Sequence, residues 1–304
     1  MTEAILTEGL IYGILAIGVF ITFRVLDFPD LTVEGSFPLG AAVAAALLVA
    51  GVPFPLAVLV AMLAGGAAGA LTALIHTGFR VPPLLAGIVV MTGLYSVNLR
   101  VMGGKSNIQL VGLRPLADFS KSWIPGLEPA FAQALFFILV AILLVILLDL
   151  FFHTEFGLTL GALGDNERMV TASGSNPDSY KVAGVALGNA FAALSGAFAS
   201  QHHGFADVNL GSGVVALGLA SVMIGELLFR TNRIGGQIAR AILGAVLFKA
   251  IMFGARFYGY FAGITPNDLR LVTALMIVFS LGVGKLRSQL AARKNQRARR
   301  RLSA

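Results

Sequence analysis

The sequence has no cysteine and little charge. Its 304 residues include no Cys, and Asp, Glu, Lys and Arg together make up only 12%, whereas soluble domains carry about 25%. Without cysteine the chain can form no disulfide and offers no thiolate for metal or redox chemistry. The scarcity of charge excludes a soluble domain. The hydrophobic content of 57% and the mean hydropathy of +0.85 predict an all-α polytopic membrane protein.

The sequence also lacks the patterns of common hydrolases. It has neither the G-x-S-x-G pattern of serine hydrolases nor the H-E-x-x-H pattern of zinc enzymes. The stretch Gly103–Ser106 resembles the end of a phosphate-binding loop, but that loop needs glycine where Leu99 stands. We therefore expect no catalytic residue, no metal site and no cofactor on this chain, so any ATP would be hydrolysed by another chain.

Apolar windows of about 20 residues, the length that crosses a bilayer, predict the membrane-spanning helices. There are nine of them, near residues 4–24, 36–52, 54–77, 82–102, 130–152, 178–200, 209–229, 235–256 and 268–284. Spans two to four and spans seven to nine each begin with a Gly/Ser-rich helix, and in each group the last span follows a proline. Since the two groups have opposite orientation by this count, they fit the inverted repeat on which many transporters are built.

Basic residues gather at the C-terminal end of the sequence. Residues 285–304 hold eight of the 22 Lys and Arg residues and no Asp or Glu. Basic residues beside a span mark the cytoplasmic side and can touch anionic lipid, which explains the tail more simply than nucleic-acid binding does. Counting back from a cytoplasmic tail places the N-terminus and the loops 103–129 and 201–208 outside, and the loop 157–181 inside.

The loop from Gly157 to Lys181 is the longest polar interruption between two spans. Its polar face comes from Asp165, Asn166, Glu167 and Arg168, and its loose apolar face from Leu158, Leu160, Leu163, Met169 and Val170. Gly174 can end a helix in the left-handed conformation, and Asn176-Pro177 fits the start of the next span. A short helix of this kind suits docking on a soluble partner, and an ordinary interhelical loop is the alternative.

Several polar residues are predicted at membrane depth. The stretch 26–37 carries three carboxylates between two apolar runs, and it is either a cytoplasmic connector or the lining of a water-filled cavity. In the fourth span three polar residues share one helix face, either as a pore lining or as interhelical hydrogen bonds. As candidates for a translocation pathway we select Glu34, Ser36, Thr92, Tyr95 and Asn98. Lys249 is the deepest cation, and it needs a carboxylate, a carbonyl or water as partner.

Four stretches carry a resemblance to a known family. They are G-A-L-G-D-N-E-R-M-V-T-A-S-G-S-N at 161–176, D-L-T-V-E-G-S-F at 30–37, G-I-V-V-M-T-G-L-Y-S-V-N-L-R at 87–100 and G-L-A-S-V-M-I-G-E at 218–226. The first resembles the coupling segment of ABC importer permeases of the branched-chain amino acid and ribose type. Together the four resemble the subgroup that works with tryptophan/tyrosine-type binding proteins.

The resemblance implies a permease domain over residues 1–284, with a coupling loop at 157–181 and a basic cytoplasmic tail at 285–304. It further implies a homodimer in the cell membrane, a separate ABC ATPase subunit that binds ATP and Mg, and an extracytoplasmic substrate-binding protein. The transported solute would be an amino acid of aromatic or branched-chain type. The residues expected to couple to the ATPase are Leu163, Gly164, Asp165, Asn166, Glu167, Arg168 and Gly174. Leu163 departs from many relatives of the wider family, which have a basic residue there, so no salt bridge to the ATPase is expected at this position.

Two other classes of function compete with an importer permease. A self-contained secondary transporter, driven by an ion gradient, would use Glu34 and Lys249 as its ionisable groups, and the loop 157–181 would then be a mere linker. An integral membrane enzyme would need a catalytic constellation, and the sequence contains none that we recognise.

Overall fold

The structure is a computed structural model that describes residues 2–110, 113, 115–123, 128–229, 231–259, 271–279 and 282. Most of these residues are helical, and residues 271–279 form a short unlabelled helix. The labelled elements are α1 (Thr2–Val19), which continues as the π-helix η1 (Phe20–Val25), α2 (Val33–Val49), α3 (Phe54–Phe79), α4 (Pro83–Val101), β1 (Asn107–Gln109), α5 (Pro115–Trp123), α6 (Pro129–Phe152), α7 (Glu155–Asp165), α8 (Glu167–Ala172), α9 (Pro177–His203), β2 (Phe205–Asp207), α10 (Val214–Leu228) and α11 (Ile234–Gly259).

Six of the described helices are long and apolar enough to cross a membrane. They are α1 together with η1, α3, α4, α6, α9 and α11. α2 and α10 are apolar but shorter, with 17 and 15 residues, and the ninth predicted span is described only at 271–279 and 282. The expectation of an all-α polytopic membrane protein is therefore confirmed, whereas the count of nine spans is not established. The basic tail lies outside the described residues.

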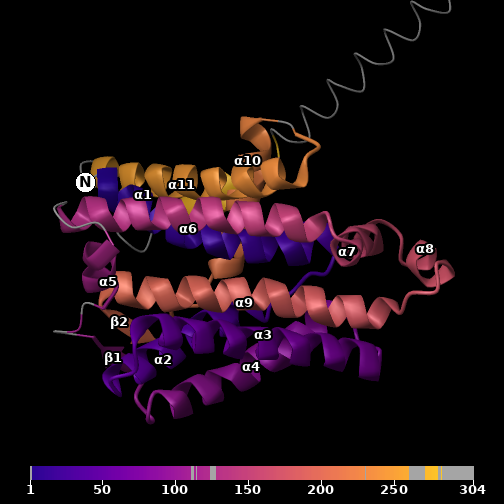
Figure 1. The fold of residues 1–304 in the computed structure, drawn as a ribbon, viewed down its shortest axis with the longest axis horizontal. Coiled ribbons are helices and arrows are strands. Elements are labelled where there is room, and N and C mark those ends of the chain that lie inside the picture. The colour runs from indigo at the N-terminus through magenta and orange to yellow at the C-terminus, as the bar shows by residue number, and fades with distance from the viewer. Residues whose placement is uncertain are drawn as a thin grey trace, which may run out of the picture.

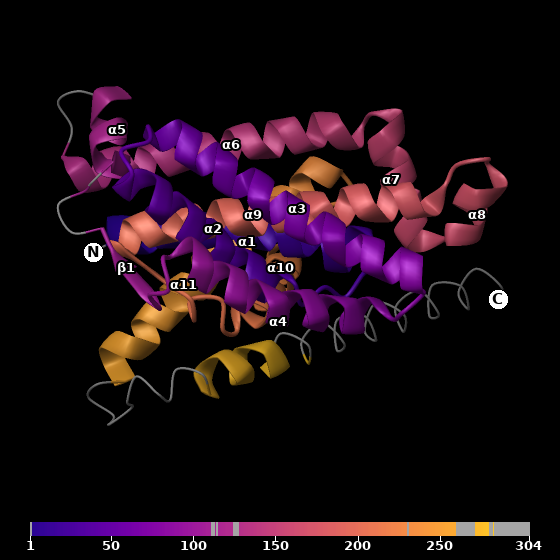
Figure 2. The same cartoon turned by 90° about the horizontal axis from the view of Figure 1, so that it is seen from below.

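The connections between the helices gather at two opposite ends of the bundle. The N-terminus, α5 and the two strands lie at one end, and α7 and α8 lie at the other (Figures 1 and 2). β1 pairs antiparallel with β2, with Ile108 opposite Ala206. The loop after α4 and the loop after α9 thus lie at the same end of the bundle. This agrees with the count of spans from the sequence, which places both loops on the outer side.

α1 and α9 form the centre of the bundle. In the most apolar part of each of these helices 78% of the residues are buried, against 22% in α6. α9 packs against α1, α2 and α3. α6 instead presents Leu139, Leu143 and Leu147 outward, each about half exposed. Because apolar side chains at these positions suit hydrocarbon, α6 lies on the lipid-facing side of the chain.

Glycine allows the central helices to cross closely. A Cβ atom on Gly40 of α2 would overlap the backbone of Ala193, and one on Gly196 of α9 would overlap the backbone of Phe37. Gly69 does the same for α3 against α9. Transmembrane helices pack through such small residues because no hydrophobic force drives them together in lipid. The glycine-rich composition is therefore used directly at the helix crossings.

The chain is irregular between η1 and α2. Residues 26–32 have no regular structure, and Asp27 adopts a φ of 52°, which is uncommon for a residue other than glycine. Asp30 and Thr32 in this segment are fully buried. Irregular backbone at membrane depth persists where protein buries it. Asp27 and Pro29 of the same segment are exposed, so the segment is partly enclosed by the helices and partly open at the surface.

Candidate functional site: a central pocket and a pair of docking helices

A network of buried polar side chains holds the break between η1 and α2. Asp30 accepts hydrogen bonds from the backbone N–H of Thr32 at 2.8 Å and from the side-chain amide of Asn189 at 2.6 Å. Ser36 donates to the Asn189 side-chain oxygen at 2.7 Å, and the hydroxyls of Thr32 and Thr72 lie 2.6 Å apart. All five residues are fully buried. The network therefore ties α2, α3 and α9 together around the irregular segment.

A pocket of about 440 Å³ lies beside this network, between α2, α4 and the turn that precedes α10. Four of the five residues that we selected for a pathway line it, namely Glu34, Thr92, Tyr95 and Asn98. The fifth, Ser36, is bonded to Asn189 within the buried network and does not line the pocket. The structure thus brings most of the selected residues together and separates Ser36 from them. We name this cavity the central pocket.

The carboxylate of Glu34 meets the start of α10 at the edge of the central pocket. Its Oε1 accepts a hydrogen bond from the backbone N–H of Gly213 at 3.2 Å. Gly213 is the residue before α10 and has a φ of 81°, a conformation that glycine adopts at little cost. A negative charge is stabilised at a helix N-terminus. Glu34, near the start of α2, therefore also fixes the start of α10.

α4 exposes a polar face next to the central pocket. Thr92, Tyr95 and Ser96 are exposed, whereas Val90 and Leu94 of the same helix are buried. Thr92 donates to the backbone oxygen of its own helix four residues earlier, at 2.8 Å, and so forms no bond to a second helix. That bond satisfies the Thr92 hydroxyl as a donor, but the exposed Tyr95 and Ser96 would be unfavourable against hydrocarbon without hydrogen-bond partners. This face is therefore suited to meet water or another protein surface.

The loop 157–181 folds into two short helices, whereas the sequence predicted one. Asp165 is the last residue of α7, and Glu167 is the first of α8. Asn166 between them has extended backbone, and its side chain accepts a hydrogen bond from the backbone N–H of Met169 at 3.2 Å. This is the usual N-cap interaction. A cap within the predicted single helix is the reason that the chain turns there.

The predicted end of this loop is confirmed. Gly174 follows α8 with a φ of 84°, which is the left-handed conformation expected after a helix. Asn176 accepts a hydrogen bond from the backbone N–H of Asp178 at 3.0 Å, and Pro177 is the first residue of α9. The two signals therefore fix where α8 stops and where the next span begins.

The expected coupling residues divide into a buried set and an exposed set. Leu163 is only 5% exposed, and Gly164 packs so closely on Val25 that an added Cβ would overlap its backbone. The exposed members are Asp165, Asn166, Glu167, Arg168 and Gly174. Met169, which the sequence predicts on the same apolar face as Leu163, is 55% exposed. Leu163 and Gly164 therefore anchor α7 to the bundle, while Met169 stands at the free surface.

Two contacts of the site were not foreseen from the sequence. Lys181 of α9 forms an ion pair with Glu167 of α8 at 2.7 Å, which holds the tip of the loop against the next span. Asn189 joins Asp30 to Ser36 in the buried network. A single Asn in the stretch 182–200, where the other residues are small or apolar, was the available signal for Asn189. The pairing with Lys181 had no local signal, because 14 residues and a turn separate the two side chains.

The adjacent histidines at the end of α9 do not make a metal site. The rings of His202 and His203 lie 5.7 Å apart, at an interplanar angle of 60°. In the part of the chain that the structure describes, no group of three His, Cys, Asp or Glu side chains is placed to hold a metal ion. We therefore assign no metal ligand.

Comparison with known proteins identifies the class to which this architecture belongs. Residues 1–281 match the family described as "Branched-chain amino acid transport system / permease component". The chain is 39% identical, over 94% of its length and 92% of the relative's, to the "Tyrosine transport system permease protein" of Clostridioides difficile (strain R20291). It is 30% identical, over 91% of its length and 95% of the relative's, to an uncharacterised protein of Rickettsia prowazekii (strain Madrid E). No solved structure matches the chain. The resemblance seen in the sequence is confirmed, and the chain belongs to the branched-chain amino acid family of ABC importer permeases.

Proposed function

We propose that the chain forms the membrane pathway of an importer for an amino acid with an aromatic or branched side chain. The observation that carries this proposal is the 39% identity along nearly the whole chain to a permease of a tyrosine transport system. A separate ATPase subunit supplies the energy, because the chain has no phosphate-binding loop of its own. ATP and Mg would then be held by that subunit and not by this chain.

The ATPase docks on α7 and α8. Asp165, Arg168 and Met169 are exposed at this end of the bundle, and they offer a carboxylate, a guanidinium and a flexible apolar side chain. Methionine adapts its shape to a partner surface more readily than other apolar residues. α7 itself is anchored to the bundle by Leu160, which is fully buried. A movement of the docked partner would therefore be passed to the membrane helices.

The opposite end of the bundle receives the substrate-binding protein. This end carries α5 and the β1–β2 ribbon (Figure 1), and the side chain of Asn107 donates to Asp207 at 3.3 Å to reinforce the ribbon. Two loops that are far apart in the sequence thus form one ordered surface. With this end outside the cell, α7 and α8 lie in the cytoplasm. The basic tail is then also cytoplasmic, where it can contact anionic lipid.

Two copies of the chain assemble around the polar face of α4. Thr92, Tyr95 and Ser96 are exposed on a single copy, and a second copy related by a two-fold axis would present the same residues across an aqueous space between the two copies. The central pockets of both copies would then open toward that axis. Apolar walls with a few polar groups suit a zwitterionic amino acid with an apolar side chain.

The two short apolar helices support an inverted repeat and nine crossings. α2 follows the irregular segment 26–32, and α10 follows the turn that ends at Gly213. The two helices begin beside one another, since Glu34 at the start of α2 bonds to Gly213 at the start of α10. Interrupted helices that meet at the repeat interface are a common way to build a transport site.

Transport requires two arrangements of the membrane helices. Closure of the ATPase pair on ATP would move the docked α7 and α8, and the bundle would rock so that the pathway opens to one side and then the other. The irregular segment between η1 and α2 is bonded to Asn189 of α9, so it would move together with that helix. ATP can drive this change only through contacts that differ between the two arrangements.

The structure removes much of the support for a self-contained secondary transporter. That hypothesis used Lys249 and Glu34 as ionisable groups waiting for an ion. Lys249 is paired with Glu8 at 2.8 Å, and Glu34 accepts a hydrogen bond from Gly213. Both groups therefore have a partner within the fold.

The decisive experiment measures whether α8 holds the ATPase. The solubilised chain would be purified with its ATPase subunit as wild type and as the Arg168→Glu and Met169→Asp variants. Both residues are exposed and make no ion pair within the described chain, so the fold should persist. Lys105→Glu is the matched control, because Lys105 is also exposed but lies at the opposite end. We expect wild type and Lys105→Glu to retain the ATPase and the α8 variants to lose it.

A reconstitution assay completes the test. Proteoliposomes with the permease, the ATPase and the binding protein should accumulate a tyrosine-like or leucine-like amino acid only when ATP is present. If the chain alone moves an amino acid along an ion gradient, and the wild type holds no ATPase, the importer proposal is wrong.

A further inference from the structure

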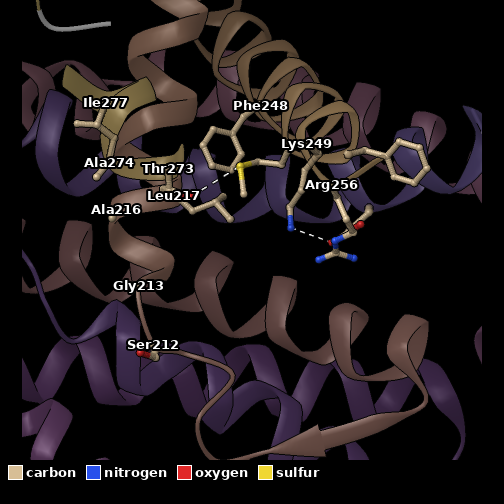
Figure 3. A pocket seen from close by; sticks show the side chains of 13 residues that line it. Ser212, Gly213, Ala216, Leu217, Phe248, Lys249, Arg256, Thr273, Ala274 and Ile277 are labelled. Atoms are coloured by element: carbon tan, nitrogen blue, oxygen red, sulfur yellow. Dashed lines mark hydrogen bonds and ion pairs between the residues drawn. The ribbon is translucent and has the colours of Figure 1, made fainter. Parts of the chain in front are cut away.

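A second cavity, of about 460 Å³, lies between α1, α10, α11 and the helix 271–279 (Figure 3). It shares one lining residue, Ser212, with the central pocket. The two cavities therefore lie on either side of the turn that precedes α10. Cavities of about 300–1,000 Å³ hold small-molecule ligands in proteins, so this second cavity, the outer pocket, has the size of a binding site.

The charged groups of the outer pocket lie together. Lys249 is 2.8 Å from the carboxylate of Glu8, and its Nζ lies 3.5 Å from the centre of the Tyr12 ring. These contacts hold a side chain that is only 13% exposed. Arg256 lies in the last turn of α11, seven positions after Lys249. It is exposed and has no ion-pair partner among the described residues. This part of the pocket thus contains one ion pair, between Lys249 and Glu8, and one cation that is unpaired among the described residues, Arg256.

Apart from Ser212 and Thr273, the rest of the outer pocket is lined by glycine and apolar side chains. Leu217 and Phe248 lie away from the charged ends of Lys249 and Arg256, and Ile277 of the helix 271–279 lies further along the same side (Figure 3). A ligand that fills this cavity would therefore place a charged group at one end and a bulky apolar group at the other. A purely apolar or a purely ionic ligand would leave part of the lining without a partner, which is unfavourable.

We propose that the outer pocket binds a free amino acid with a large apolar side chain, as a station before the central pocket. The carboxylate of the amino acid bonds to Arg256, with Lys249 nearby, and its ammonium group faces Glu8. The side chain packs against Phe248, Leu217 and Ile277. Arginine recognises a carboxylate by two parallel hydrogen bonds, which makes Arg256 the specific anchor. The assignment rests on the importer function proposed above and adds the place where the permease itself recognises its substrate.

The choice of variant follows from the contacts. Glu8→Gln would leave the largely buried Lys249 without its carboxylate and could disturb the fold. Arg256→Gln removes a side chain that is exposed and unpaired in the described chain, so folding should be unaffected. Arg100→Gln is the matched control, because Arg100 is also an exposed arginine in the last turn of a membrane helix, α4, and lines neither pocket.

Isothermal titration of the purified chain in lipid nanodiscs tests the site. The probes are L-tyrosine, L-leucine, tyramine, which lacks the carboxylate, and 3-(4-hydroxyphenyl)propanoate, which lacks the ammonium group. We expect L-tyrosine to bind and both truncated analogues to bind at least tenfold more weakly, since each loses a hydrogen bond to a charged group. Arg256→Gln should weaken L-tyrosine by roughly tenfold or more and leave tyramine unchanged, while Arg100→Gln should bind as wild type does.

Three results would overturn the assignment. They are no binding of L-tyrosine or L-leucine to the wild type, equal affinity for L-tyrosine in Arg256→Gln and wild type, and tighter binding of 3-(4-hydroxyphenyl)propanoate than of L-tyrosine. The last result would indicate a site for an anionic amphiphile such as a lipid. In each case ATP-driven uptake by the complete importer decides separately whether the proposed function stands, because uptake without binding at the outer pocket contradicts only the site.

Discussion

The side chain of Asp30 accepts a hydrogen bond from the amide of Asn189 at 2.6 Å, although 159 positions separate the two residues in the sequence. The same amide group donates to the backbone oxygen of Val185, and Asn189 also accepts from Ser36. One asparagine on the central helix thus satisfies groups from three parts of the chain. Because buried polar groups are costly when left without partners, these bonds fix the irregular segment before α2 in one position.

The first prediction concerns the direction of the bond between Asp30 and Asn189. Asn189→Asp places two carboxylates in contact. It should lower the free energy of unfolding by about 1–3 kcal/mol, the usual cost of a buried unsatisfied group. The exchanged pair Asp30→Asn/Asn189→Asp restores an amide opposite a carboxylate and should recover part of the loss. Thermal unfolding in detergent, followed by size-exclusion fluorescence, measures both. An exchanged pair no more stable than Asn189→Asp would show that the two side chains do not interact as described.

The second prediction uses two neighbouring glycines of α3. A Cβ atom on Gly65 would overlap Ala193, whereas one on Gly66 would lie 3.6 Å from its nearest neighbours, at ordinary contact distance. Both changes to alanine gain the same helix propensity, about 1 kcal/mol. We expect Gly65→Ala to destabilise the protein by about 1–3 kcal/mol through overpacking and Gly66→Ala to be neutral or slightly stabilising. Equal melting temperatures for the two variants would contradict the close crossing of α3 and α9.

The membrane architecture could be predicted from the sequence because it depends on local properties. Apolar runs, Gly174 and Asn176-Pro177 located the spans and the end of the coupling loop. The spacing of Thr92 and Tyr95 also placed both on one face, which the structure shows to be exposed. Each of these signals is contained in a few consecutive residues. They required no knowledge of how distant segments pack.

What could not be predicted depends on tertiary packing. Leu163 and Met169 looked equivalent in the sequence, but α7 turns Leu163 into the core and the cap at Asn166 redirects α8, so that Met169 faces outward. Likewise Ser36 was selected together with Glu34 as a candidate for the pathway. Asn189 of a distant helix decides that Ser36 is bound in the buried network instead.

The third prediction separates two roles within α8. Glu167 is bonded to Lys181 at 2.7 Å, so Glu167→Lys changes the position of α8 even if no partner touches Glu167. An exposed ion pair contributes only about 0.2–1 kcal/mol, and the effect on stability should be small. We expect Glu167→Lys to weaken ATPase binding and Glu167→Lys/Lys181→Glu to restore it. Copurification measures both, and Lys181→Glu alone should resemble Glu167→Lys. If the double variant binds no better than the single one, Glu167 contacts the partner directly.

The fourth prediction exploits the absence of cysteine, which leaves any introduced thiol as the only one in the chain. Tyr95 of α4 and Leu143 of α6 are exposed to similar extents, 49% and 54%, but only Tyr95 lines the central pocket. If α4 borders an aqueous pathway and α6 faces lipid, a charged, membrane-impermeant thiol reagent should modify Tyr95→Cys in intact proteoliposomes and leave Leu143→Cys unmodified. Thiolate forms readily in water and poorly in hydrocarbon, so the difference in rate should be large. Mass spectrometry of the intact protein measures the extent of modification. Equal reaction at the two positions, or none at Tyr95→Cys, would place the polar face of α4 outside the pathway.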